Sequence, residues 1–128
     1  MISTMGQSLT TVKEVAAGNR AEVLAVTIPY KVYASRRDLE SGRRLGLSLV
    51  PGMVTSNAAG EAIGSACVSS GGRVFDLTGA FRAEAEEASL FFEPDGHLNQ
   101  KEHEVFARLL TPALEGYLSQ TGRGGRQR

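Results

Sequence analysis

Cys67 is the only cysteine in the chain, so it carries the only thiol that could act as a nucleophile. A reactive thiol needs a lowered pKa, which a neighbouring histidine or cation usually provides. The sequence instead predicts a β-hairpin that sets Asp76 opposite Cys67, and a nearby carboxylate raises the pKa of a thiol. We therefore expect Cys67 to pack as a small apolar side chain without a catalytic role.

Four potential metal ligands lie close together in the chain: His97, Glu102, His103 and Glu104. Ligands on one helix must be three or four positions apart to share a face. His103 and Glu104 are neighbours and point apart, and His97 precedes the expected helix. Acidic side chains at a helix start also suit the helix dipole without any metal. The pattern predicts solvated polar residues, with no metal and no cofactor.

A group of four arginines is the best candidate for ligand binding, and it surrounds two carboxylates. Its members are Arg36, Arg37, Arg43 and Arg44, around Asp38 and Glu40. In a helix, Arg36, Glu40 and Arg44 would form ion pairs at four-residue spacing. In a loop, the guanidinium groups could hold a phosphate or a carboxylate. The segment therefore has two interpretations: a helix with ion pairs, or a loop that binds an anionic ligand.

Glycine-rich stretches give weaker signals. Residues 69–72, Ser-Ser-Gly-Gly, could hold an anion with their backbone amides, but the tight turn of a hairpin explains the two glycines equally well. No Walker motif, dinucleotide fingerprint or nucleophile elbow is present in the sequence. Arg123, Arg126 and Arg128 give the tail the composition of an RNA-contacting segment, although three cations provide little affinity at cellular salt. Nucleic acid is therefore an unlikely partner.

The composition predicts one soluble, globular and cytoplasmic domain. The chain has 128 residues, 41% hydrophobic and 22% charged, and its formal net charge is zero. Charge is uneven along the sequence: residues 1–44 carry +3, residues 61–115 carry −6, and the tail carries +3. Basic ends and an acidic middle favour association with another copy or with an anionic partner. Apolar runs are too short to span a membrane.

Periodicity predicts several strands ahead of a final helix. Residues 22–34 alternate as a strand, with Pro29 marking an edge or a bulge. Residues 45–49 and 53–56 read as two further short strands. Residues 61–70 and 73–78 flank Gly71-Gly72 as a hairpin. Residues 80–89 fit a strand and a helix equally well.

Helical signals are clearest at the C-terminus. Residues 99–120 carry an apolar stripe, with Asn99 as the N-cap and Pro112 as a position that either kinks the helix or splits it in two. Residues 9–17 are expected to form a short helix that ends at Gly18. We expect residues 8–120 to form a single domain between a disordered start (1–7) and a disordered basic tail (121–128). The predicted fold is α+β, a mainly antiparallel sheet packed by the C-terminal amphipathic helix.

Three functions fit this sequence. The first is a non-catalytic binding or regulatory module that associates with itself, as a homodimer, or with a protein partner. The second is a small α+β enzyme or small-molecule carrier with a pocket between the sheet and the last helix. That pocket would use Tyr30, Tyr33, Asp76 and either His97 or His103. The third is a nucleic-acid accessory protein acting through its arginine clusters.

Overall fold

The structure, a computed structural model, describes residues 2–92 and 96–122. The elements in chain order are α1 (Ile2–Gly18), β1 (Leu24–Thr27), the 3-10 helix η1 (Lys31–Tyr33), α2 (Arg36–Arg44), the 3-10 helix η2 (Pro51–Thr55), α3 (Ala58–Ser69), β2 (Arg73–Asp76), α4 (Thr78–Glu87) and α5 (Gln100–Gln120). The expectation of a mainly antiparallel sheet is wrong. The described chain is mostly helical, with a small sheet of two strands.

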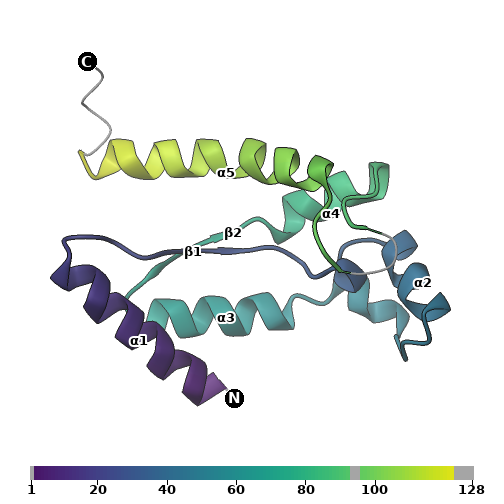
Figure 1. Cartoon of the computed structure of the whole chain (residues 1–128), viewed down its shortest axis with the longest axis horizontal. Coiled ribbons are helices and arrows are strands. Elements are labelled where there is room, and N and C mark those ends of the chain that lie inside the picture. The colour runs from purple at the N-terminus through teal and green to yellow at the C-terminus, as the bar shows by residue number, and fades with distance from the viewer. Residues whose placement is uncertain (1, 93–95, 123–128) are drawn as a thin grey trace.

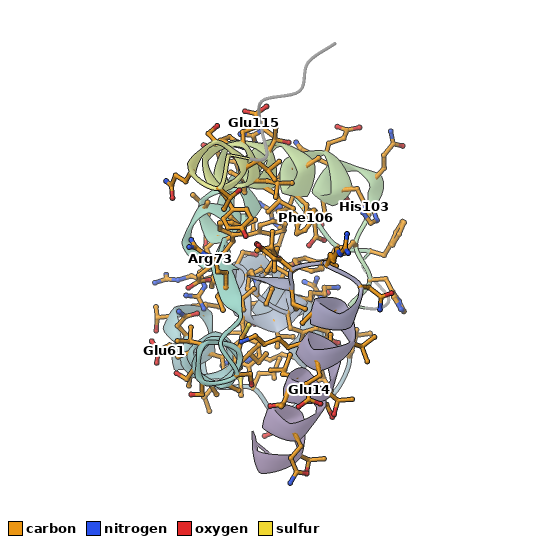
Figure 2. The ribbon with its side chains drawn as sticks, turned by 90° about the vertical axis from the view of Figure 1, so that its left-hand side faces the viewer. Glu14, Glu61, Arg73, His103, Phe106 and Glu115 are labelled. Carbon is orange, nitrogen blue, oxygen red and sulfur yellow. The ribbon has the colours of Figure 1, made fainter. Side chains whose placement is uncertain are left out.

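The two strands run parallel, in a register that pairs Leu24 with Arg73 and Thr27 with Asp76. Parallel strands need a long crossover, which here contains α2 and α3. The helix α5 lies over one face of the strands, whereas α1 and α3 lie beneath the other (Figures 1 and 2). The result is a helix–sheet–helix arrangement in which both faces of the small sheet are covered.

The last helix shares one apolar core with α4 and with Val26 of β1. The fully buried cluster contains Ala34, Leu77, Phe81, Ala85, Leu90, Phe91 and Val105. Val26 of β1 and Leu110 of α5 are half-buried and pack against it. The rings of Phe81 and Phe106 meet edge to face at 6.3 Å, which joins α4 to α5.

The predicted hairpin is wrong because Gly71 and Gly72 end a helix. Gly71 has a φ of 73°, and its N–H donates to the carbonyl of Val68 at 2.8 Å. The Gly72 N–H donates to the carbonyl of Cys67 at 2.9 Å. These two bonds form a Schellman motif, which closes the alanine-rich helix α3. Positive φ at glycine serves a helix end as readily as a hairpin turn, so the sequence signal was ambiguous.

Two other predicted strands, 45–49 and 53–56, do not form, and the strand predicted over 22–34 forms only as the short β1. Most of the stretch 22–34 is irregular or 3-10 helical, because Pro29 follows the short β1 and cannot donate to a ladder. Residues 45–49 form a loop, and η2 begins at Pro51. The side chains of Leu45 and Leu47 are 57% and 49% exposed, so their alternation does not mark a buried strand face.

The helix predicted to begin after Asn99 is confirmed. Asn99 caps α5, accepting a hydrogen bond from the Glu102 N–H at 3.0 Å, and Pro112 lies within the uninterrupted helix. Ser35 caps α2 in the same way, so the arginine segment is helical. The ambiguous residues 80–89 are largely helical in α4, and α1 begins at Ile2, earlier than expected. No helix in the described residues is long and apolar enough to cross a bilayer.

Candidate functional site

The ends of four secondary-structure elements meet at one end of the small sheet. The parallel strands β1 and β2 finish there, and the helices α3 and α4 begin there, beside α2 in Figure 1. In α/β proteins, ligands bind outside the carboxyl ends of parallel strands, where the connecting loops diverge. Here this position holds a cavity of about 250 Å³.

The cavity has apolar walls and a few polar groups. It is lined by Val26, Thr27, Ile28, Pro29, Tyr30, Tyr33, Ser56, Asn57, Ala59, Gly60, Ile63, Thr78 and Arg82. The aliphatic lining residues come from the end of β1 and the segment after it, Val26 and Ile28, and from α3, Ala59 and Ile63. A small apolar space with a limited set of polar groups is typical of a small-molecule site.

Asp76 fixes the strand ends and the helix starts around this cavity. Its Oδ1 accepts hydrogen bonds from Thr27 Oγ1 at 2.8 Å and from the Thr78 N–H at 3.0 Å. Its Oδ2 accepts a longer bond from Asn57 Nδ2 at 3.4 Å. Hydrogen bonds from Thr78, chiefly from its side chain, then from Thr27 and Asn57, hold the pKa of Asp76 at about 2. The carboxylate is therefore ionised at neutral pH.

Arg82 joins three of the segments that surround the cavity. Its Nε donates to the carbonyl of Tyr33 at 3.0 Å, and its Nη2 donates to the carbonyl of Ser56. One guanidinium thereby joins α4 to η1 and to the segment that precedes α3. Because the side chain is half-buried and also lines the cavity, it places a fixed positive charge at the wall.

The amino end of α3 is the third polar feature. Asn57 is its N-cap residue, but the side chain donates to Asp76 and makes no capping bond. The first N–H groups of a helix have no partner within the helix. Ala59 and Gly60, in the first turn of α3, both line the cavity. A ligand acceptor can therefore take the place of the missing side-chain cap.

The residues that the sequence suggested for a pocket are only partly brought together. Tyr30 and Tyr33 line the cavity, and Asp76 anchors it. His97 and His103 are both exposed and do not line it; Figure 2 shows His103 on α5. The cavity lies between β1, α3 and α4, whereas the sequence suggested a pocket between the sheet and the last helix.

The four arginines have different surroundings. Arg43 donates to the carbonyl of Leu49 through Nε and Nη2 and pairs with Glu40, so it closes the loop after α2. Arg37 and Arg44 line a second cavity, of about 230 Å³. Arg36 is exposed and does not line that cavity. Arg123, Arg126 and Arg128 lie outside the described residues.

Cys67 is almost fully buried, and its Sγ–H donates to the carbonyl of Arg73 at 3.6 Å. The predicted pairing with Asp76 is wrong, because Cys67 belongs to α3 and Asp76 pairs with Thr27 of β1. Across residues 2–92 and 96–122, no three His, Cys, Asp or Glu side chains come together as metal ligands.

Sequence reasoning missed Asn57, Thr78 and Arg82. The spacing of Asp76 and Thr78 was a usable signal, because an aspartate often accepts a bond from the N–H two residues later. Arg82 and Asn57 gave no local signal, since the crossover brings their partners from distant segments. No protein-family model, curated protein or solved structure matches the chain, so its function is argued from this geometry.

Proposed function

We propose that this protein is a small-molecule-binding domain, with its site in the cavity at the carboxyl ends of β1 and β2. The observation that carries the proposal is the position of an apolar cavity where two strands end and two helices begin. Its volume of about 250 Å³ lies at or below the lower end of the usual range for ligand sites, roughly 300–1,000 Å³. The expected ligand is therefore small.

The polar groups of the cavity favour a ligand with an acidic or hydrogen-bond-accepting end. Arg82 contributes a positive charge, and the first turn of α3 contributes backbone N–H groups without a side-chain cap. Both kinds of group donate hydrogen bonds, and a helix start favours negative charge. The aliphatic walls would contact the remainder of the ligand. A short-chain carboxylic acid has this combination of features.

Binding is a better proposal than acid–base catalysis for this cavity. A general base works best when its pKa lies near the working pH. Asp76, whose carboxylate bonds to three residues that line the cavity, has a pKa of about 2, because several hydrogen bonds stabilise its charge. It is thus a weak base whose hydrogen bonds are already used to hold Thr27, Asn57 and Thr78 in place.

A ligand series tests the proposal. We expect hexanoate to bind more tightly than acetate, because it contacts the aliphatic walls, and more tightly than hexan-1-ol, because it carries the charge. Ala59→Trp places a large ring at a lining position of the cavity and should abolish hexanoate binding in a ligand-observed NMR titration. Val68→Trp is the matched control, on the same helix but 62% exposed and outside the cavity. Equal loss of binding in both variants, or no binding to the native chain, would disprove the proposal.

Association with a second copy is a second candidate function, favoured by the outer edge of β1. Within the described chain, β1 pairs only with β2, and residues 23–30 carry no charge. Exposed strand edges are usually protected by charged side chains. The strand β2 has Arg73 and Asp76, whereas β1 has no such protection. Antiparallel pairing of two β1 strands across a two-fold axis would join the sheets of two copies.

Light scattering measures this association directly. We expect a mass near twice 13.6 kDa for the native chain, and a return to the single mass for Leu24→Lys. Lysine on an edge strand opposes pairing with another edge. Val68→Lys on the exposed face of α3 should leave the mass unchanged. A native chain that stays at the single mass would disprove this second candidate.

A further inference from the structure

A second cavity, distinct from the one described above, lies against α2. It has a volume of about 230 Å³ and is lined by Lys31, Arg37, Asp38, Ser41, Arg44 and Ser89. These residues come from η1, from α2 and from the segment after α4. Three of the six carry a positive charge, and two carry hydroxyl groups.

The helix α2 supplies four of these residues from one face. Arg37, Ser41 and Arg44 are spaced by four and three positions, which places them on the same side of a helix. Ser35 fixes where this helix begins, since its Oγ accepts a bond from the Asp38 N–H at 3.2 Å. The N-cap sets the first residue of α2. The helical spacing that follows places Arg37 and Arg44 on the side of α2 that lines this cavity.

Neighbouring carbonyl groups hold two of the cations at the cavity wall. Lys31 is only 4% exposed, and its Nζ donates to the carbonyl of Phe92 at 2.9 Å. Arg37 Nη2 donates to the carbonyl of Glu86 at 3.0 Å. A guanidinium has five N–H donors in a rigid plane, so one such bond orients it and leaves others for a ligand.

Among the described residues that line the cavity, Lys31, Arg37 and Arg44 are cationic and Asp38 is a carboxylate. Glu86 is also close enough to raise the pKa of Asp38. One oxygen of the Asp38 carboxylate, Oδ2, accepts a bond from Ser35 Oγ at 2.6 Å. A recessed site with low-dielectric walls concentrates the field of such charges and attracts an anion. Arginine forks, an ammonium group and serine hydroxyls together suit an anion with several oxygens.

We propose that the cavity between α2, η1 and Ser89 binds a tetrahedral oxyanion, namely phosphate, either free or as the end group of a phosphate monoester. Arg37 and Arg44 would bind the oxygens from one side and Lys31 from the inner wall. This site shares no lining residue with the cavity at the strand ends. It does not depend on the small-molecule function proposed there.

Calorimetric titration of the full chain, at constant ionic strength set by sodium chloride, tests the proposal with two probes. The probes are inorganic phosphate and glycerol phosphate. Saturable binding of inorganic phosphate alone supports a site for the free ion. Tighter binding of glycerol phosphate supports a site for the monoester. Failure of both probes to saturate the chain would overturn the proposal.

Substitutions on α2 then locate the site. Arg44→Gln should weaken phosphate binding by at least about tenfold, because it removes a charged hydrogen-bond donor. Arg36→Gln is the matched control, since Arg36 is exposed on the same helix and outside the cavity. Both side chains are exposed, so circular dichroism should show a native fold for each variant. Equal weakening by the two substitutions would indicate general attraction to a basic helix and would overturn the assigned site.

Discussion

Two carboxyl groups, those of Asp76 and Glu102, have contrasting surroundings. Asp76, at the end of β2, is exposed and accepts hydrogen bonds from Thr27, Asn57 and Thr78. Glu102, in the first turn of α5, is fully buried, and neither of its oxygens has a hydrogen-bond partner. The pKa of Asp76 is lowered to about 2, whereas that of Glu102 is raised to about 8.

Different physical causes dominate in the two places. Burial is the largest cause of the raised pKa of Glu102, and the nearby charge of Asp38 adds to it. Burial also raises the pKa of Asp38, with Ser35 and Lys31 opposing the shift. At neutral pH Asp76, which does not itself line the cavity, is thus ionised beside the strand ends, whereas the carboxyl group of Glu102 at the start of α5 is uncharged.

The two carboxyl groups differ in role: Asp76 organises the surroundings of the proposed ligand site, whereas Glu102 affects the stability of the fold. Around Asp76, a charge organises the ends of several elements beside an open cavity. Around Glu102, the absence of partners means that the fold tolerates the side chain only when it is protonated. A perturbed pKa alone would have pointed to Glu102 as the functional residue. The cavity and the hydrogen bonds point instead to the strand ends.

The largest expected effect comes from Phe81, which lies between the two regions. It is fully buried in α4, the helix that begins at the cavity and packs against α5. Phe81→Ala should lower the free energy of unfolding by roughly 3–5 kcal/mol, measured by urea denaturation. Phe92→Ala, at a ring that is 52% exposed, should cost about 1 kcal/mol or less. Similar costs for both would place Phe81 outside the core.

Replacing Glu102 with glutamine should produce the next largest effect. The protonated carboxyl group is retained in the fold up to about pH 8, whereas in the unfolded chain it ionises from about pH 4.5. Unfolding therefore releases a proton in this window, and stability falls as pH rises, by up to about 1.4 kcal/mol per pH unit. Glu102→Gln removes this slope and should be more stable than the native chain at pH 8.

Urea denaturation between pH 5 and pH 9 checks this prediction. Asp38, whose pKa is also raised, leaves a remaining slope of the same sign in Glu102→Gln. Gln100→Glu is a useful control, because it changes charge at an exposed position of the same helix turn. Identical slopes in the native chain and in Glu102→Gln would mean that Glu102 is ionised in the folded protein.

Asp76→Asn should have a smaller effect with the opposite dependence on pH. A carboxylate with a lowered pKa stabilises the fold above pH 3.8, its ordinary value, and loses that contribution as pH falls toward 2. Because the side chain is exposed, solvent screening limits the cost at pH 7 to about 1 kcal/mol. The difference between native and variant chains should shrink below pH 4. If the difference in the free energy of unfolding stays constant below pH 4, the charge of Asp76 does not stabilise the fold.

The comparison also shows which features the sequence could predict. The starts of α2 and α5 were predictable, because Ser35 and Asn99 are N-caps whose partners lie three residues away. The sheet was not predictable, because paired residues of β1 and β2, such as Thr27 and Asp76, lie 49 positions apart and the local signal at Gly71-Gly72 fits two structures. Strand direction depends on the crossover helices, which no short window reveals.

For the two carboxyl groups as well, local contacts were predictable from the sequence and tertiary contacts were not. Asp76 was a candidate on residue type, and its bond to Thr78 follows from local spacing. Its bonds to Thr27 and Asn57 depend on how the strands and α3 come together. Glu102 was expected to be a solvated residue at a helix start, because the capping pattern does not specify which side of the first turn faces the core. Its burial depends on tertiary packing, which also brings Asp38 of α2 close enough to raise its pKa.

The last prediction separates the two causes that act on Glu102. Asp38→Asn removes the neighbouring charge while leaving Glu102 buried. The pKa of Glu102, measured by carbon-13 NMR titration of its carboxyl group, should fall below about 8 but stay well above 4.5, because burial is the larger cause. Glu86→Gln, which removes a charge that faces Asp38 from α4, should change it less. A return of the pKa to its ordinary value in Asp38→Asn would show that repulsion between the two carboxyl groups, rather than burial, keeps Glu102 protonated.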